Sequence, residues 1–345
     1  MHEKKHYNPA IDLLRIIAIL AVILIHTTTR TLELSSYHLD QVPLSLFLNQ
    51  ISRFAVPLFF LISGFVLELN YPFHATYFTY LKKRFNRILI PYILWSTIYY
   101  FFVYTSHKGD FFEALMKGDA SHQLYFIPTL LIFYLLFPLI HRYYHLFARR
   151  WVVAILGLFQ LIFLYQDYYV HPLSFFNPIN IALLNYYVFF LGIIASHHQE
   201  LIMAFIKKWA YVLVIASTAM GGFIFFEGRN LYFKTHNYLS FYSQWRPSVF
   251  FYTVFLTSTL SYFLSRVKLS PNIKKLSNLS FFVFFIHIIV LEVIWHTIGI
   301  SLFQHDHHTI QQPWYDPLYF ILVATSSFSL AYIAHKIPRL SKLTG

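Results

Sequence analysis

The sequence predicts an all-α integral membrane protein with about ten transmembrane helices. Hydrophobic residues make up 57% of the 345 positions and charged residues only 12%, and the mean hydropathy is positive. This composition is typical of membrane proteins, because a soluble chain of this length needs far more charge. Long apolar segments recur along the chain, and basic residues gather in alternate short loops between them.

Each apolar segment is long enough, with its flanks, to cross a bilayer as a helix. In chain order, we expect helices at about 9–29, 45–70, 88–106, 123–142, 151–167, 178–197, 208–226, 247–265, 279–303 and 316–336. The first segment contains Arg15 and lacks a small-x-small cleavage site, so we expect it to remain as a helix rather than to be removed as a signal peptide. No loop is long enough to form a domain. We therefore expect residues 1–345 to form a single transmembrane domain without a fused soluble domain.

The distribution of charge predicts the topology. If the N-terminus is cytoplasmic, 18 Lys and Arg residues fall in inner loops and tails and only 6 in outer loops, with Arg15 and Arg53 inside spans. This bias follows the positive-inside rule and puts both termini in the cytoplasm. It also accounts for the formal net charge of +12, so the basic residues indicate membrane orientation and not a nucleic-acid partner.

The residue types exclude several kinds of site. The chain has no cysteine, which rules out a disulfide framework, a thiol nucleophile, a cysteine-ligated zinc and an iron–sulfur cluster. The histidines at 305–308 form a loop cluster that could ligate a metal. Such loops are more often solvent-exposed, so we expect no metal.

The first apolar segment carries three ionisable residues. Arg15 and His26 have ten residues between them, so on a helix their side chains share nearly one azimuth, about 16 Å apart along the axis. Asp12 lies three residues before Arg15, where the two can form an ion pair. Such residues inside a span usually face the protein interior and mark function. The alternative is that Arg15 and His26 reach the two membrane interfaces.

Two further motifs follow. Residues 56–65 read Val-Pro-Leu-Phe-Phe-Leu-Ile-Ser-Gly-Phe, and Arg84 and Arg87 form an Arg-x-x-Arg pair at the start of the third segment. Together with Arg15 and His26, these motifs resemble, in the same order, those of the membrane acyltransferase 3 family. The resemblance covers residues 9–140 best and returns at the ninth segment. The resemblance implies a ten-helix membrane enzyme. Within the family, the chain is most similar to the branch that decorates bacterial surface polysaccharides at the cell membrane.

The resemblance implies acyl coenzyme A as the donor, with acetyl as the favoured acyl group. Arg84 and Arg87, three residues apart on one helix face, are expected to bind its phosphates by charge-assisted hydrogen bonds, and Arg15 to bind the phosphates or the pantetheine arm. The alternative for Arg84 and Arg87 is a stop-transfer signal or an anionic-lipid patch. His26 is the expected catalytic residue. Asp12 and Arg15 lie nearer the other end of this helix and are expected to take part with it. His26 can act as a general base or take the acyl group itself, because imidazole exchanges protons near neutrality.

Several polar residues are candidates for contact with the acceptor or the oxyanion. Arg53, Ser63 and Tyr125 could stabilise the oxyanion of a thioester attack, although the family often has Trp where Tyr125 stands. Ser63, with Gly64 beside it, could equally serve close helix packing. His287 stands where the family often has His. Glu292 can pair with His296 one turn later, and an ionised carboxylate inside a span requires some partner.

The sequence therefore predicts a membrane O-acyltransferase. It would move an acyl group from cytoplasmic acyl coenzyme A to a hydroxyl of a cell-surface glycan or of its lipid-linked precursor, with membrane lipids as its other partners. Aromatic residues make up 21% of the chain, and the ring-rich stretch 231–246 could form a lip on the acceptor side. The alternative is a transporter or flippase of a lipid-linked saccharide, but the symmetric repeats typical of transporters are absent.

Overall fold

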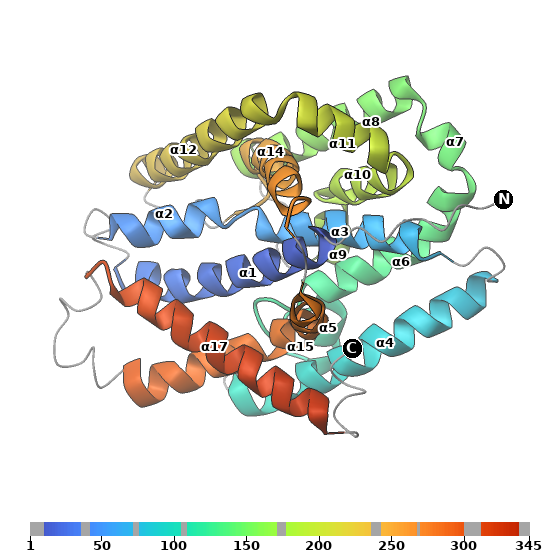
Figure 1. Ribbon diagram of the computed structural model, residues 1–345. Coiled ribbons are helices and arrows are strands. Elements are labelled where there is room, and N and C mark those ends of the chain that lie inside the picture. The colour runs from blue at the N-terminus through green and yellow to red at the C-terminus, as the bar shows by residue number, and fades with distance from the viewer. Residues whose placement is uncertain are drawn as a thin grey trace.

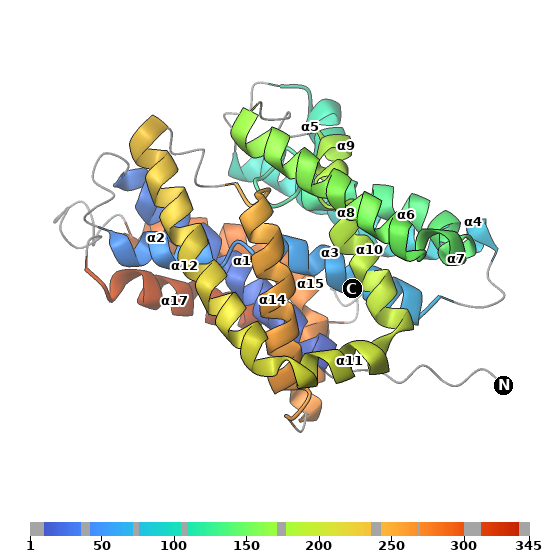
Figure 2. The same cartoon turned by 90° about the horizontal axis from the view of Figure 1, so that it is seen from above.

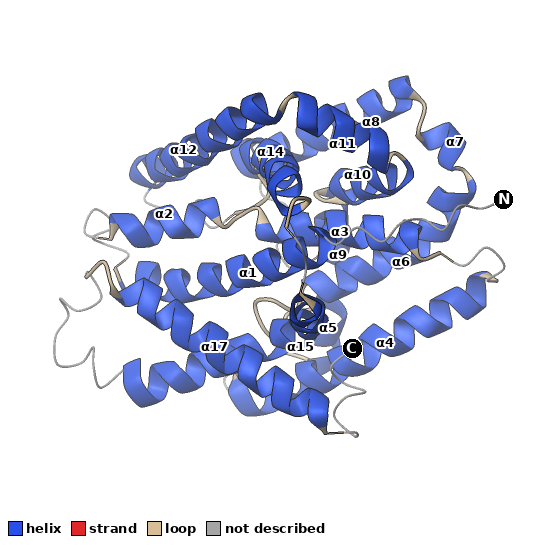
Figure 3. Ribbon diagram, in the orientation of Figure 1, coloured by secondary structure: helices blue, strands red, loops and turns tan. Residues whose placement is uncertain are grey.

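The computed structural model describes residues 10–35, 42–71, 76–104, 109–170, 177–235, 243–267, 270–299 and 312–337. Every regular element in these ranges is a helix, and Figure 3 shows no strand among them. The prediction of an all-α fold is confirmed. Seven helices of the described chain are long and apolar enough to cross a membrane, and one bent pair of helices could provide an eighth. The count of ten and the orientation of the termini stay predictions.

The helices lie close to the ten expected segments. In chain order they are α1 (Ala10–Leu34), α2 (Pro43–Ile51), α3 (Ala55–Leu69), α4 (Tyr77–Ile98), α5 (Phe111–Lys117), α6 (Phe126–Arg142), α7 (Tyr144–Phe147), α8 (Arg150–Tyr165), α9 (Pro178–Leu183), α10 (Tyr186–His197), α11 (Gln199–Lys208), α12 (Ala210–Thr235), α14 (Pro247–Leu264), α15 (Pro271–Ile294) and α17 (Tyr315–Lys336). Helices α4, α8 and α15 each continue into a π-helical turn, at Tyr99–Val103, Gln166–Val170 and Trp295–Gly299. The bent pair is α10 and α11, which meet at 99°.

Helix α1 lies at the centre of the molecule. Figure 1 shows it between α12 and α14 on one side and α15 and α17 on the other, and it packs against α2, α3, α14, α15 and α17. Figure 2, turned by 90°, shows α12 and α14 crossing the same face. The buried apolar residues of α1 are spread around the helix, as expected of a helix surrounded by others. The first motif thus lies in the interior of the bundle.

The second expected span is broken between α2 and α3. Residues 52–54 form a turn, and α3 begins at Ala55. Pro57 explains the break, because a proline cannot donate to the carbonyl four residues earlier and its ring clashes with that carbonyl. The residue four positions earlier is Arg53. The break therefore places Arg53 at a bend inside the protein rather than on a straight helix.

Helices α3 and α10 pack with their backbones in contact. A Cβ atom at Gly64 would lie 2.0 Å from the carbonyl oxygen of Phe189, and one at Gly192 would lie 2.0 Å from that of Leu61. Only glycine fits at such a distance. The packing interpretation is therefore correct for Gly64, as small residues let membrane helices approach closely.

Candidate active site

A cavity of about 190 Å³ lies between α1, α3, α4, α6 and α15. One end is polar and the other is apolar. The residues that line it are Arg15, Phe59, Ile62, Ser63, Val66, Leu67, Arg84, Arg87, Ile88, Phe126, Ile127, Leu130, Tyr134, Ser277, Asn278, Ser280, Phe281 and Phe284.

The polar end brings the three sequence motifs together. Arg15 of the first motif, Ser63 of the second, and Arg84 and Arg87 of the third all line the cavity. Arg15 and Arg87 are close enough to interact electrostatically, and Tyr134 lies near both. We call Arg15, Arg84 and Arg87 the arginine end. Three guanidinium groups around one space favour an anion, since each presents several N–H donors in a fixed plane.

Arg15 is held by two residues at the base of the cavity. Its guanidinium lies 3.8 Å from the carboxylate of Asp12, which confirms that these two residues pair. Ser277 of α15 donates to Asp12 at 2.7 Å and accepts from Arg15 at 3.3 Å. Asp12 is buried, so it balances a charge and directs the Arg15 side chain into the cavity. Ser277 was not predicted, because nothing in the sequence relates it to a helix 262 positions earlier.

The apolar end of the cavity is made of aromatic rings. Phe59 of α3, Phe126 of α6 and Phe284 of α15 line it together with Ile127. The Phe126 ring centroid lies 5.7 Å from that of Phe284 and 6.0 Å from that of Phe59. A chain that enters between the arginines therefore meets apolar surface further in.

His26 and His287 lie beyond the aromatic end. Their ring centroids are 5.3 Å apart, and Phe284 contacts His287 at 6.4 Å. We call this pair the histidine end. Nδ1 of His287 donates to the Val283 backbone carbonyl at 3.1 Å, since a carbonyl oxygen can only accept. The buried Nε2 of His287 has no hydrogen-bond partner among the described residues. His26 is partly accessible and is not in the cavity wall. Phe284 thus separates the histidine end from the cavity.

Arg53 and Tyr125 lie near the histidine end and are both buried. Arg53 interacts electrostatically with His26 and with Tyr125, and it donates to the side-chain oxygen of Asn49 at 3.1 Å through Nε. Tyr125 accepts a hydrogen bond of 2.6 Å from Gln244. His122, on the segment before α6, is a further electrostatic neighbour of His26. The structure therefore brings Arg53 close to His26 and Tyr125 close to Arg53, whereas Ser63 lies in the cavity.

Glu292 has two partners. Arg30 donates to its carboxylate oxygens at 2.6 and 2.7 Å, and His296 lies 3.7 Å away, one turn along the helix. The pairing of Glu292 with His296 is confirmed, and Arg30 is a stronger partner that was not predicted. The Arg30 guanidinium also lies over the Trp295 ring, 5.2 Å from its centroid. This geometry assigns Glu292 to a contact between α1 and α15.

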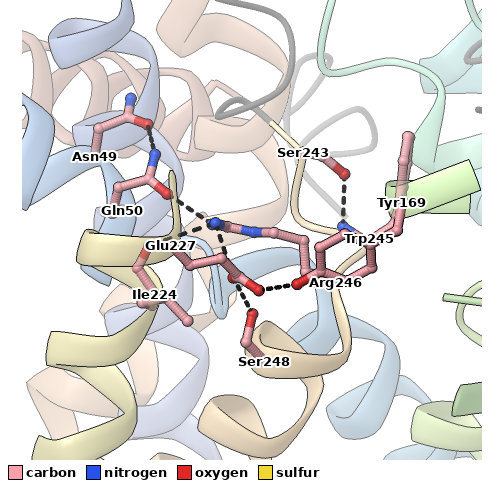
Figure 4. Close-up of polar contacts among 9 residues, drawn as sticks. All are labelled: Asn49, Gln50, Tyr169, Ile224, Glu227, Ser243, Trp245, Arg246 and Ser248. Carbon is pink, nitrogen blue, oxygen red and sulfur yellow. Dashed lines mark hydrogen bonds and ion pairs between the residues drawn. The ribbon is translucent and has the colours of Figure 1, made fainter. Parts of the chain in front are cut away.

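Sequence reasoning missed a buried network around Arg246, which Figure 4 shows. Arg246 is fully buried and donates to Gln50 at 2.6 Å, and its ion pair with Glu227 measures 3.3 Å. Gln50 continues the network to Asn49, and Ser248 and Tyr169 donate to Glu227. In the sequence, Arg246 ends the stretch 231–246 that could form the acceptor lip. The signal for its burial was Glu227, a carboxylate one residue beyond a predicted span.

The expected acceptor lip is only partly described. Residues 231–235 continue α12, residues 236–242 lie outside the described ranges, and residues 243–246 follow. Gln244 and Trp245 are buried, and Trp245 packs edge-on against Tyr125 at 5.9 Å. This part of the stretch faces the interior near the histidine end rather than forming an exposed rim.

A second missed cluster ties α3, α6 and α10 together. The Glu68 side chain is fully buried, and its carboxylate lies 2.9 Å from Nδ1 of His141 and 2.8 Å from Nε2 of His197. Tyr144 stacks on His197 with centroids 3.8 Å apart. Three ionisable residues within or at the ends of predicted spans were the signal. Their contacts with each other indicate a structural role.

In the described ranges, no group of three His, Cys, Asp or Glu residues could hold a metal ion. The histidine cluster at 305–308 lies outside these ranges. His141 and His197 are joined to Glu68 by side-chain hydrogen bonds.

Comparison with known proteins gives a consistent family. A family model described as "Acyltransferase domain" matches residues 8–336. The chain is 26% identical over 298 residues to a "Probable poly-beta-1,6-N-acetyl-D-glucosamine export protein" of Staphylococcus aureus (strain MRSA252), with 81% of each chain covered. It is 25% identical over 302 residues to a protein of the same name from Staphylococcus epidermidis, with 82% of this chain and 81% of the relative covered. No solved structure matches the chain.

Proposed function

The chain belongs to the acyltransferase family, and on this basis we propose that it is a membrane O-acyltransferase of the cell membrane. It moves an acyl group, acetyl in the first instance, from cytoplasmic acyl coenzyme A to a hydroxyl of a cell-surface glycan or of its lipid-linked precursor. The observation that carries the proposal is the meeting of Arg15, Ser63, Arg84 and Arg87 in one cavity whose far end adjoins the histidines.

The cavity suits part of the donor. At about 190 Å³ it is smaller than the roughly 300–1,000 Å³ of sites that enclose a drug-sized ligand. It can therefore take a thin chain such as the pantetheine arm but not a nucleotide as well. The phosphates then stay near the mouth, where Arg84 and Arg87 bind them by charge-assisted hydrogen bonds. The arginine end accordingly faces the cytoplasm, where acyl coenzyme A is made.

The reaction is an acyl transfer at the histidine end. The acceptor oxygen attacks the thioester carbonyl carbon, the carbon–oxygen bond forms and the carbon–sulfur bond breaks. His26 takes the proton of the acceptor hydroxyl and passes it to the departing thiolate, so that free coenzyme A leaves as a thiol. Arg53, close to His26, stabilises the negative charge that develops on the carbonyl oxygen. His287 lies next to His26, with the two ring centroids 5.3 Å apart.

The names of the relatives favour a second function. Both are called export proteins of poly-β-1,6-N-acetyl-D-glucosamine, so this chain could instead move a glycan across the membrane. The same names suggest the acceptor to test first, because the sugar units of this polymer carry free hydroxyl groups. Export requires a polysaccharide path and no thioester cleavage, which makes the two functions separable by one assay.

The test uses the full chain in nanodiscs, with acetyl coenzyme A labelled in the acetyl group and oligomers of β-1,6-linked N-acetylglucosamine as acceptor. Free thiol release reports thioester cleavage without background, because the chain has no cysteine. Mass spectrometry of the oligomer reports O-acylation. We expect acetyl transfer by the parent protein, abolished in His26→Ala and weakened in Arg84→Ala.

A parent protein that releases no thiol, and in proteoliposomes moves labelled oligomer across the membrane, would establish export instead. Thiol release that is unchanged in His26→Ala would remove His26 from the mechanism. In cells, deletion of the gene followed by mass spectrometry of the surface polysaccharide identifies the acyl group.

A further inference from the structure

We propose that Phe126 and Phe284 determine which acyl group the protein accepts, by bordering the acyl chain of the donor and limiting it to a few carbon atoms. The inference rests on the proposed acyltransferase function and adds the residues that set its donor specificity.

The cavity itself shows which end receives the acyl group. Arg15, Arg84 and Arg87 line one end, and Phe59, Phe126 and Phe284 line the other. An acyl-thioester has the same asymmetry, since its nucleotide is anionic and its acyl end is apolar. Placing the apolar end against the rings removes apolar surface from water, and the reverse orientation would bury phosphate charge among them.

The spacing along α15 puts this apolar end directly before the histidine end. Ser277 contacts Arg15 at one end of the cavity, and Phe284 closes the other. They are seven positions apart, or about 10 Å at 1.5 Å per residue. His287 follows one turn later with its ring 6.4 Å from Phe284. A thioester at the level of Phe284 is thus next to His287, whose ring lies 5.3 Å from that of His26, the proposed catalytic residue.

The two rings are held in place by other rings. Phe126 packs on Phe60 at 4.6 Å and on Phe59 at 6.0 Å, and Phe284 packs on Phe285 at 5.4 Å. Both Phe126 and Phe284 are at most 9% exposed. Close-packed interiors accommodate extra atoms poorly. Each methylene beyond the space that the rings leave must therefore displace one of them.

The experiment measures kcat/KM of thiol release for acetyl, butyryl and hexanoyl coenzyme A. The variants are Phe126→Leu and Phe284→Leu. Each replaces the ring by a smaller apolar side chain, so the protein should still fold. Phe133→Leu is the matched control. Phe133 lies on the same helix as Phe126, is buried, and packs on Phe60 at 5.3 Å, but it does not line the cavity.

We expect the parent and Phe133→Leu to prefer acetyl. Phe126→Leu or Phe284→Leu should raise the ratio of hexanoyl to acetyl kcat/KM by about tenfold or more, the discrimination expected when a pocket changes by a methylene or more. A parent that cleaves no acyl coenzyme A refutes the proposed function. A parent that cleaves acetyl coenzyme A while both ring variants keep its chain-length profile refutes only this inference. An equal shift in Phe133→Leu also refutes it, because the effect would then be general loosening.

Discussion

The arginine end and the histidine end each include a residue of α1, but the arginine side chains at the two ends have different surroundings. Around the histidine end, each cation contacts an acceptor within the protein: Arg30 contacts Glu292, Arg246 contacts Glu227 and Arg53 contacts Asn49. At the arginine end, Arg15 shares Asp12 with Ser277, and Arg84 lies over the Tyr80 ring, 5.9 Å from its centroid. Arg15, Arg84 and Arg87 differ from the other three arginines because they line the cavity, where they can bind a ligand.

The largest expected effect tests the histidine end. His26→Ala should lower kcat about 10²- to 10⁴-fold, the usual contribution of a general base, and should leave the dissociation constant of acetyl coenzyme A unchanged because His26 lies outside the cavity. Steady-state kinetics and calorimetric titration measure the two quantities. His145→Ala, an exposed histidine on α7, is the control. If His26→Ala weakened donor binding as much as it lowered kcat, the histidine end would not be a site of catalysis separate from the site of donor binding.

Among the changes that affect stability, breaking the network around Arg246 should lower the free energy of unfolding most. Glu227→Gln leaves the fully buried Arg246 guanidinium without its carboxylate, and we expect a loss of about 3–5 kcal/mol in the free energy of unfolding. Thermal unfolding in detergent measures the change. In Glu113→Gln, which removes an exposed ion pair with Lys117, the melting temperature should not move. A melting temperature that also stays the same in Glu227→Gln would show that this carboxylate does not hold the helices.

The next largest effect on stability should come from the packing of α3 against α10 at Gly64. Gly64→Ala places a Cβ atom 2.0 Å from the Phe189 carbonyl oxygen, so α3 and α10 must separate, and overpacking of this kind costs about 1–3 kcal/mol. Gly222→Ala in α12 is the matched control, with no described atom within 4 Å of its Cβ, and should be neutral or slightly stabilising. Thermal unfolding distinguishes them. Equal melting temperatures for the two variants would contradict the close contact.

The smallest expected effect concerns the donor cations. Arg84→Ala and Arg87→Ala should each weaken acetyl coenzyme A binding about tenfold, since hydrogen bonds between charged groups contribute roughly 1.5–3 kcal/mol when desolvated and less near solvent. The loss should shrink as ionic strength rises, because salt screens these charges. Arg149→Ala, an exposed arginine before α8, should bind normally. Donor affinity that does not depend on salt would assign Arg84 and Arg87 to lipid headgroups.

The sequence predicted the residues of the arginine end better than those that surround it. Arg15, Ser63, Arg84 and Arg87 were recognisable because ionisable or small polar residues at fixed spacing stand out within apolar segments. Ser277, Phe126 and Phe284 were not, because their role depends on how α15 and α6 are rotated against α1. Phenylalanine is abundant, with 39 in the chain, so no single one is distinguished by composition.

Local chemistry also explains what was missed in the fold. Pro57 predicts the break before α3, but the hydropathy of residues 45–70 alone suggests one continuous helix. The burial of Arg246 depends on Gln50 and Glu227, which lie 196 and 19 positions away. A pairing at such sequence separations leaves no periodic pattern, and only the three-dimensional arrangement shows it.

The contact of Gly64 and Gly192 has a mechanical consequence. The backbones of α3 and α10 are in contact, and Glu68 on α3 also bonds to His197 on α10. We therefore expect these two helices to move together as one rigid body. We therefore expect the widening that admits a cofactor arm to come from α4, the wall that carries Arg84 and Arg87. A spin-label pair reporting on α3 and α10 should keep one fixed separation through the catalytic cycle, while a pair spanning α3 and α4 should not.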